Sequence, residues 1–326
     1  MGEFYQSTKN ITNALSSSLI HDDEQPTSKT KSPTSSSPLS PQSSQYRYIN
    51  GRQFHNLVDS VYPLPNDYQE LDRISMQHFL YKAIWDGNFK APIHRKLMAG
   101  DCKVLDVGCG PGPWVMEMAM TYPLSNFTGI DISPIQPRDI KPRNSKFYEM
   151  NILNDLPFKD GAFDFCHQRS MALCFTRAQY AEKVIPNLLR VTKQGGILEI
   201  MEVDLMFTNP GPLLKTMMSS YQDFLEKREI DLFPGIRIKE YLEKSEQLKD
   251  ISQEIIDIPM GSDHGKLAEL MAENYATASK AQIPLFAPFL KMSNEELENI
   301  IDQIYKVEVN EYNTSVRAYR YYGTKI

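Results

Sequence analysis

The stretch VLDVGCGPGPW, residues 104–114, decides the fold. A hydrophobic run breaks into alternating glycines and then resumes as an apolar segment of helical character. Glycines at such a strand-to-helix turn permit a sharp bend and bring a ligand close to backbone N–H groups at the start of the helix. Glycine also occurs in βα turns for packing alone, so the turn indicates a ligand site without deciding which ligand.

The composition narrows the class of protein. The chain has 326 residues, of which 41% are hydrophobic and 23% charged, as in ordinary globular proteins. Its formal net charge of −6 disfavours a nucleic-acid partner, because proteins that bind nucleic acids usually carry a basic field. The four cysteines form no C-x-x-C pair, and no apolar stretch approaches the length of a membrane span. We therefore expect reduced thiols, no metal site, no membrane association, and a cytoplasmic protein, with the nucleus as the alternative.

The domain organisation follows from a change in composition. Residues 21–46 are almost entirely Ser, Thr, Pro, Gln and charged residues, which bury too little apolar surface to offset chain entropy. We predict a disordered tail over residues 1–46 and one domain over residues 47–326. The expected parts of this domain are a helical cap (47–99), a cofactor-binding core (100–205), and a helical region with the last strands (206–326).

Strands and helices alternate through the core. Strands are expected at KVLDVG, NFTGIDI, SKFYEMNI, FDFCHQR, GGILEIMEVD and SQEIIDIPMG, with helices at GPWVMEMAMTY and RAQYAEKVIPNLLRVT. Residues 311–326, EYNTSVRAYRYYGTKI, are expected to form a last, antiparallel strand at the edge of the sheet. The pattern predicts a doubly wound, Rossmann-like α/β fold with seven mostly parallel strands and helices on both faces.

Asp131 strengthens the case for a nucleoside ligand, because it ends the strand after the glycine turn, nineteen residues beyond Gly112. A carboxylate there is placed to accept hydrogen bonds from both hydroxyls of a ribose. A nicotinamide dinucleotide would satisfy these features equally well. Its G-x-G-x-x-G fingerprint, begun at Gly108, needs glycine at position 113, where the chain has proline. A nicotinamide-dependent oxidoreductase is therefore the weaker alternative.

The D-x-G-x-G-x-G pattern at residues 106–112 resembles that of the class I S-adenosylmethionine-dependent methyltransferases. The resemblance continues through DLPFKDGAFDFCHQR and LLRVTKQGGILEIMEVD, and the segments PLPNDYQELDRISMQHFLY and YRYYGTK are similar to fungal members, including the velvet-associated regulator type. It implies S-adenosyl-L-methionine as the cofactor. The loop of Asp106, Gly108, Cys109, Gly110 and Gly112 is then implied to hold the methionine half of the cofactor. Asp131 and Ile132 are implied to contact the ribose, and Asn151 and Ile152 to border the adenine. Many members have aspartate at the position of Asn151.

Candidate catalytic residues follow the fourth and fifth strands, where ligands gather in open α/β sheets. His167 is the first, with a packed strand-end histidine as the alternative. Gln168 is expected to reach the methionine end of the cofactor, and Arg169 to pair with a structural carboxylate. Glu202, in MEVD, is expected to bind or deprotonate the methyl acceptor, with a solvated strand end as the alternative.

These observations are compatible with two functions. One is methyl transfer to a small molecule with a partly apolar body. For this function Tyr68, His78, Tyr81 and Trp85 of the cap are candidates for a lid, with core packing as the alternative, and Met217 and Met218 are candidates for the lining of an apolar acceptor pocket. The other is a methyltransferase-like regulator that acts through protein partners, which the Ser/Pro-rich tail and the fungal resemblance motivate. The sequence predicts neither the acceptor nor the oligomeric state.

Overall fold

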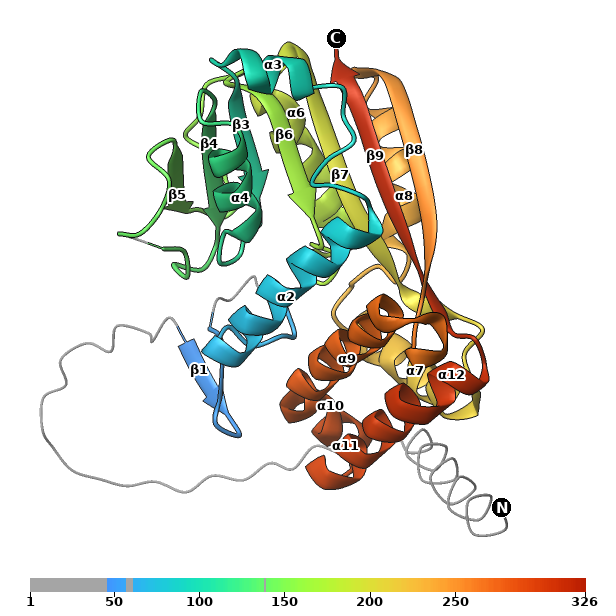
Figure 1. Cartoon of the computed structure of the whole chain (residues 1–326). Coiled ribbons are helices and arrows are strands. Elements are labelled where there is room, and N and C mark those ends of the chain that lie inside the picture. The colour runs from blue at the N-terminus through green and yellow to red at the C-terminus, as the bar shows by residue number, and fades with distance from the viewer. Residues whose placement is uncertain (1–45, 57–60, 138) are drawn as a thin grey trace, which may run out of the picture.

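The computed structural model describes residues 46–56, 61–137 and 139–326, so the prediction for the tail falls, apart from Tyr46, outside the described residues. A seven-stranded sheet in the order β5-β4-β3-β6-β7-β9-β8 forms its centre (Figure 1). The strands are β3 (Lys103–Val107), β4 (Asn126–Asp131), β5 (Ser145–Glu149), β6 (Phe163–Arg169), β7 (Thr192–Thr208), β8 (Leu248–Pro259) and β9 (Ser315–Lys325). Strands β3 to β7 pair in parallel, and β9 is antiparallel to both of its neighbours. The predicted fold class is confirmed.

Strand β9 lies inside the sheet, so the prediction of an edge strand is wrong. It pairs with β7 on one side and with β8 on the other. Its Tyr319 and Tyr321 are buried in a cluster with Ile238 and Leu242 of helix α8 (Pro234–Lys244). Tyrosines are common on half-exposed strands, but here a helix covers them. The strand at this edge of the sheet is β8, in which every second residue of the stretch 252–257 is exposed.

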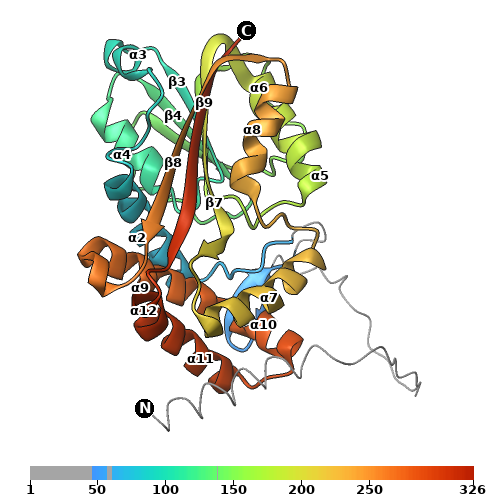
Figure 2. The ribbon, with the colours of Figure 1, turned by 90° about the vertical axis from the view of Figure 1, so that its right-hand side faces the viewer.

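Helices cover both faces of the sheet, as Figure 2 shows. One face carries α3 (His94–Ala99) and α4 (Pro113–Thr121), and the other carries α6 (Ile185–Val191) and α8, with the short α5 (Arg177–Gln179) and a π-helical turn (Tyr180–Val184) before α6. Two separate hydrophobic clusters form beneath these layers. No helix within the described ranges is long and apolar enough to cross a membrane.

A small hairpin precedes the cap helix. Strands β1 (Tyr46–Ile49) and β2 (Arg52–His55) pair antiparallel across Asn50 and Gly51, whose φ angles are +49° and +77°. Asn-Gly is the preferred sequence of the tight hairpin turn that needs positive φ at both positions. This dipeptide was the signal for two strands that the periodicity of the sequence did not predict.

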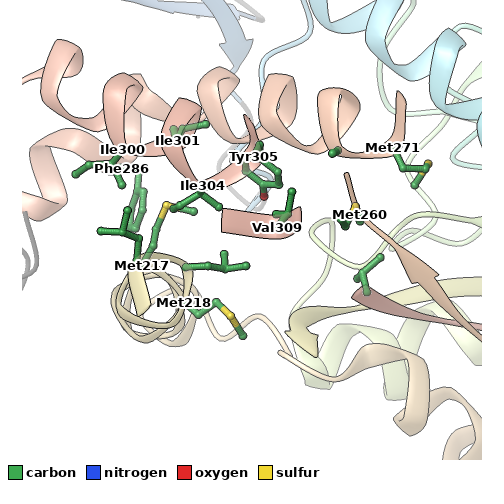
Figure 3. Packing of buried hydrophobic residues seen from close by; sticks show 14 of the residues in the cluster. Met217, Met218, Met260, Met271, Phe286, Ile300, Ile301, Ile304, Tyr305 and Val309 are labelled. Atoms are coloured by element: carbon green, nitrogen blue, oxygen red, sulfur yellow. The ribbon is translucent and has the colours of Figure 1, made fainter. Parts of the chain in front are cut away.

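The remaining helices form a layer beyond the ends of the strands. They are α2 (Tyr68–Ile84), α7 (Pro212–Glu226), α9 (Lys266–Ala281), α10 (Ile283–Leu290), α11 (Asn294–Gln303) and α12 (Val309–Glu311), with a 3-10 turn (Ser262–His264) before α9 and a π-helical turn (Ile304–Glu308) after α11. Met217 and Met218 of α7 belong to the core of this layer, where Figure 3 shows Met217 beside Phe286 and Ile304. The prediction that these methionines line an acceptor pocket is therefore wrong.

Candidate functional site

A cavity of about 530 Å³ lies at the carboxyl ends of β3, β4 and β6. Helix α2 crosses below these strand ends (Figure 1), and side chains of α2 and α9 line the cavity together with the strand-end loops. Asp67 caps α2 by accepting a hydrogen bond from the Glu70 N–H at 3.1 Å, and it also pairs with Arg52 of the hairpin. The cap helix and the hairpin are thus fixed to each other at the rim of the cavity.

Most of the predicted site residues meet in this cavity. Those that line it are Asp106, Gly108, Cys109, Gly110, Asp131, Ile132, Asn151, Ile152 and His167. Gly112, Gln168 and Glu202 do not line it. The fold therefore brings together predicted residues from the ends of four strands, β3, β4, β5 and β6, which are far apart in the sequence.

Gly108, Gly110 and Gly112 of the turn all have positive φ, but their surroundings differ. A Cβ atom on Gly108 would lie 2.1 Å from Sδ of Met171, and one on Gly112 would lie 2.6 Å from the Phe147 ring. These two glycines allow close packing. A Cβ on Gly110 would meet only Ile74, at 3.6 Å. At Gly110 the bare backbone faces the cavity, which is where a ligand requires it.

Asp131 is held at the end of β4 by two backbone donors. Its Oδ2 accepts from the Gly110 N–H and its Oδ1 from the Ser133 N–H, each at 2.9 Å. Burial raises the pKa of the Asp131 carboxyl. Each oxygen keeps further acceptor capacity, because a carboxylate oxygen has two lone pairs. The side chain is therefore able to accept two hydroxyl groups of a ribose.

His167 is packed and oriented rather than exposed at a strand end. Its Nδ1 lies 2.7 Å from Oδ1 of Asp106, and its ring stacks on Trp114. Its Nε2 is buried and has no hydrogen-bond partner among the described residues. In the tautomer whose Nδ1–H donates to Asp106, Nε2 carries a lone pair.

Comparison with known proteins decides the family. The family described as "Methyltransferase domain" matches residues 104–196. Methyltransferase pytC of Aspergillus terreus is 31% identical over 236 residues, which are 69% of this chain and 68% of that protein. The chain belongs to the class I S-adenosylmethionine-dependent methyltransferases.

Further relatives of this methyltransferase include a regulator. Secondary metabolism regulator laeA of Aspergillus flavus is 25% identical over 284 residues, which are 83% of this chain and 74% of that protein. Among solved structures, phosphoethanolamine N-methyltransferase 2 of Haemonchus contortus has a TM-score of 0.44 and 15% identity, covering 77% of this chain and 57% of its own.

The cavity of this methyltransferase suits S-adenosyl-L-methionine in the chemistry of its lining. The open backbone at Gly110, the held carboxylate of Asp131 and the buried, unpartnered Nε2 of His167 provide polar groups in a cavity that is otherwise mainly apolar. Asn151 uses its side-chain oxygen to accept the Leu153 N–H at 2.9 Å, so it shapes the loop after β5. Across the residues that the structure covers, no cluster of His, Cys, Asp and Glu is arranged to hold a metal ion.

Glu202 and Gln168 of the methyltransferase lie behind the cavity wall. The Glu202 carboxylate accepts the Met171 and Ala172 N–H groups at 2.6 and 3.2 Å, and burial raises its pKa to about 8. The Gln168 amide donates to the hydroxyl of Tyr180. Glu202 therefore supports the loop after β6, whose residues 170–175 line the cavity, and Gln168 connects β6 to the π-helical turn before α6.

Sequence reasoning missed the far wall of the site. Asn274 and Tyr275 of α9 line the cavity, although they follow β6 by about a hundred residues. No motif marks them, because the helix reaches the site only through packing against α2. Of the cap residues considered for a lid, His78 and Tyr81 line the cavity, whereas Tyr68 is exposed.

Proposed function

We propose that this methyltransferase transfers the methyl group of S-adenosyl-L-methionine to a small molecule by direct displacement. The observation that carries the proposal is the extent of the cavity, which continues from the cofactor residues into a chamber between α2, α9 and β7. A concave chamber of this size aligns an acceptor with the cofactor end of the cavity, and it accommodates a small molecule.

The chamber favours an acceptor with an apolar body and a polar group. Apolar side chains that line it include Leu64, Leu71, Val203, Leu205 and Ala278. The buried hydroxyls of Tyr81 and Tyr275 also belong to it, and they interact with each other. The hydroxyl that does not donate to its neighbour offers a donor to an acceptor oxygen or nitrogen. A polar acceptor atom held in this way would be fixed in an otherwise apolar chamber.

We further propose that His167 contacts the acceptor. The cofactor supplies a sulfonium methyl group that is already activated for displacement, so a base is required only when the acceptor arrives protonated. Asp106 holds the ring through Nδ1 and leaves the lone pair of Nε2 to accept a hydrogen bond or a proton. For Glu202 the contacts favour a positioning role, because its oxygens hold the loop after β6.

Isotope labelling tests the proposal. Purified protein is mixed with methyl-labelled cofactor and a small-molecule cell extract, and products are identified by mass spectrometry. We expect label in one or a few small molecules, and none with Gly110→Val, whose side chain would enter the cofactor end of the cavity. Label found only in protein would contradict a small-molecule acceptor.

The relative named as a regulator supports a second function, in which the protein acts through protein partners. Its similarity extends over most of this chain, beyond the cofactor core. Removal of residues 1–46 separates the two functions. A small-molecule enzyme should keep its turnover, whereas a regulator should lose partner binding and keep its affinity for the cofactor.

We also propose that residues 47–326 act as one methyltransferase domain in the cytoplasm. The four cysteines are unpaired, as expected for thiols in a reducing compartment. Fractionation of cells that produce the tagged protein tests this location against the nucleus.

A further inference from the structure

Arg169, at the end of β6, is a half-buried cation that lines the cavity. The predicted partner of Arg169 is a structural carboxylate, but no carboxylate of the described residues forms a salt bridge with it, and Arg169 contacts His78 instead. Its Nη2 lies 2.9 Å from Nδ1 of His78, and its guanidinium lies 5.9 Å from the centre of the Tyr81 ring. A half-buried guanidinium with no carboxylate in direct contact is therefore available to pair with a negatively charged group of a ligand.

His78 holds this guanidinium without neutralising it. Nε2 of His78 lies 2.8 Å from Oε2 of Glu117 in α4, and Glu117 also pairs with Lys82. Burial and the charge of Arg169 lower the pKa of His78 to about 4, so the ring is neutral near pH 7. The neutral ring donates from Nε2–H to Glu117 and accepts from Arg169 at Nδ1. Glu117, His78 and Arg169 thus form a chain that orients the guanidinium.

The order of the strands indicates which ligand group reaches Arg169. Asn151 follows β5, Asp131 ends β4, and Asp106 and Arg169 lie at the ends of the adjacent strands β3 and β6. A ligand with its adenine beside β5 and its ribose at Asp131 extends its amino-acid end toward Asp106 and Arg169. One anionic and one cationic side chain there match the ammonium and carboxylate groups of an amino acid.

We propose that Arg169 binds the carboxylate of the methionine moiety of the cofactor, and that His78 and Glu117 are positioning residues for this contact. The inference rests on the proposed use of the cavity by S-adenosyl-L-methionine. A carboxylate on the methyl acceptor would offer the same chemistry, so the experiment separates these two sources.

Titration calorimetry on the full chain tests the proposal with two ligands. S-Adenosylhomocysteine contains the amino-acid group, and 5′-methylthioadenosine lacks it. We expect Arg169→Met to weaken the binding of S-adenosylhomocysteine by about 10- to 100-fold, as for the loss of a charge-assisted hydrogen bond, and to leave the binding of 5′-methylthioadenosine within about twofold. Arg169→Lys should recover part of the loss. Arg190→Met, at a half-buried arginine outside the cavity, is the control and should change neither affinity.

His78 has its own test. His78→Phe should weaken S-adenosylhomocysteine several-fold and leave 5′-methylthioadenosine unchanged, and His78→Gln should recover part of the loss through its amide. Unaltered affinity of Arg169→Met for S-adenosylhomocysteine would overturn the proposal and point to an acceptor carboxylate. An equal loss for both ligands would also overturn it, as a structural effect. Failure of the unmodified protein to bind either ligand would instead refute the use of the cavity for this cofactor.

Discussion

The imidazole of His167 lies flat against the indole of Trp114, with ring centroids 4.1 Å apart and planes 1° from parallel. Trp114 stands in the first turn of α4, directly after the glycine turn, and its Nε1 donates to the Asn88 carbonyl at 2.9 Å. The segment that presents the cofactor-binding backbone thus also fixes the ring proposed to contact the acceptor.

Replacement of Trp114 should therefore affect stability strongly. Trp114 is 2% exposed, and we expect Trp114→Ala to lower the free energy of unfolding by about 3–5 kcal/mol. Trp114→Phe should lose less, because a ring remains against His167. Urea unfolding followed by circular dichroism measures both. A loss below about 1 kcal/mol for Trp114→Ala would show that the stack contributes little.

Asp131→Ala should weaken cofactor binding by about 1.5–3 kcal/mol, since it removes an acceptor proposed for the ribose hydroxyls. Titration with S-adenosylhomocysteine gives the affinity. The control is Asp160→Ala, because the Asp160 side chain is 82% exposed and lies outside the cavity. Equal affinity of the two variants would refute the assignment of Asp131.

Alanine variants of Gly110 and Gly195 distinguish the effect of backbone strain on stability from the loss of cofactor binding. Gly110 and Gly195 have φ of +55° and +74°, and a Cβ on Gly195 would meet nothing within 4 Å. Alanine at either position should cost about 1 kcal/mol of stability because of the positive φ. Only Gly110→Ala should also weaken cofactor binding, by tenfold or more. Thermal unfolding and titration calorimetry of both variants check this expectation.

The Glu202 carboxyl should make stability depend on pH. Its pKa is about 8 in the folded state because of burial, against about 4.3 when unfolded. At a pH between these two pKa values, Glu202 is protonated in the folded protein and ionised in the unfolded chain. The free energy of unfolding therefore falls as pH rises through this window, by at most about 1.4 kcal/mol per pH unit.

Glu202→Gln should remove this slope, as urea unfolding at pH 6.5 and 8 would show. This interval is chosen because His78, whose folded pKa is about 4, gives the opposite slope only below about pH 6.5. Identical slopes in the two proteins would contradict the effect of burial on Glu202.

The sequence allowed prediction of the parts of the site that depend on local chemistry. The glycine turn and Asp131 need only the order of strand, turn, helix and strand, and their placement at one cavity follows from the parallel sheet. Gln168, the residue after His167, was predicted to contact the cofactor but does not line the cavity. Side chains alternate between the two faces of a strand, so Gln168 lies on the face of β6 opposite His167 and Arg169, and this alternation disfavours the predicted contact of Gln168 with the cofactor.

Long-range packing was not predictable in the same way. Tyr275 reaches the cavity because α9 packs on α2, and the interior position of β9 depends on its pairing with β8. Neither the packing of α9 on α2 nor the pairing of β9 with β8 is indicated by a short sequence motif. The partner of Arg169 was not predictable from the sequence either, because its contact with His78 joins residues that are about ninety positions apart.

The position of β9 has a consequence for the order of assembly. Strand β8 precedes β9 by more than fifty residues, yet joins the sheet only through it. During synthesis, β8 must wait as an unpaired strand until residues 315–325 leave the ribosome. Shortening the chain before residue 315 would remove both ladders of β9 at once, and would expose the flank of β7 to other chains.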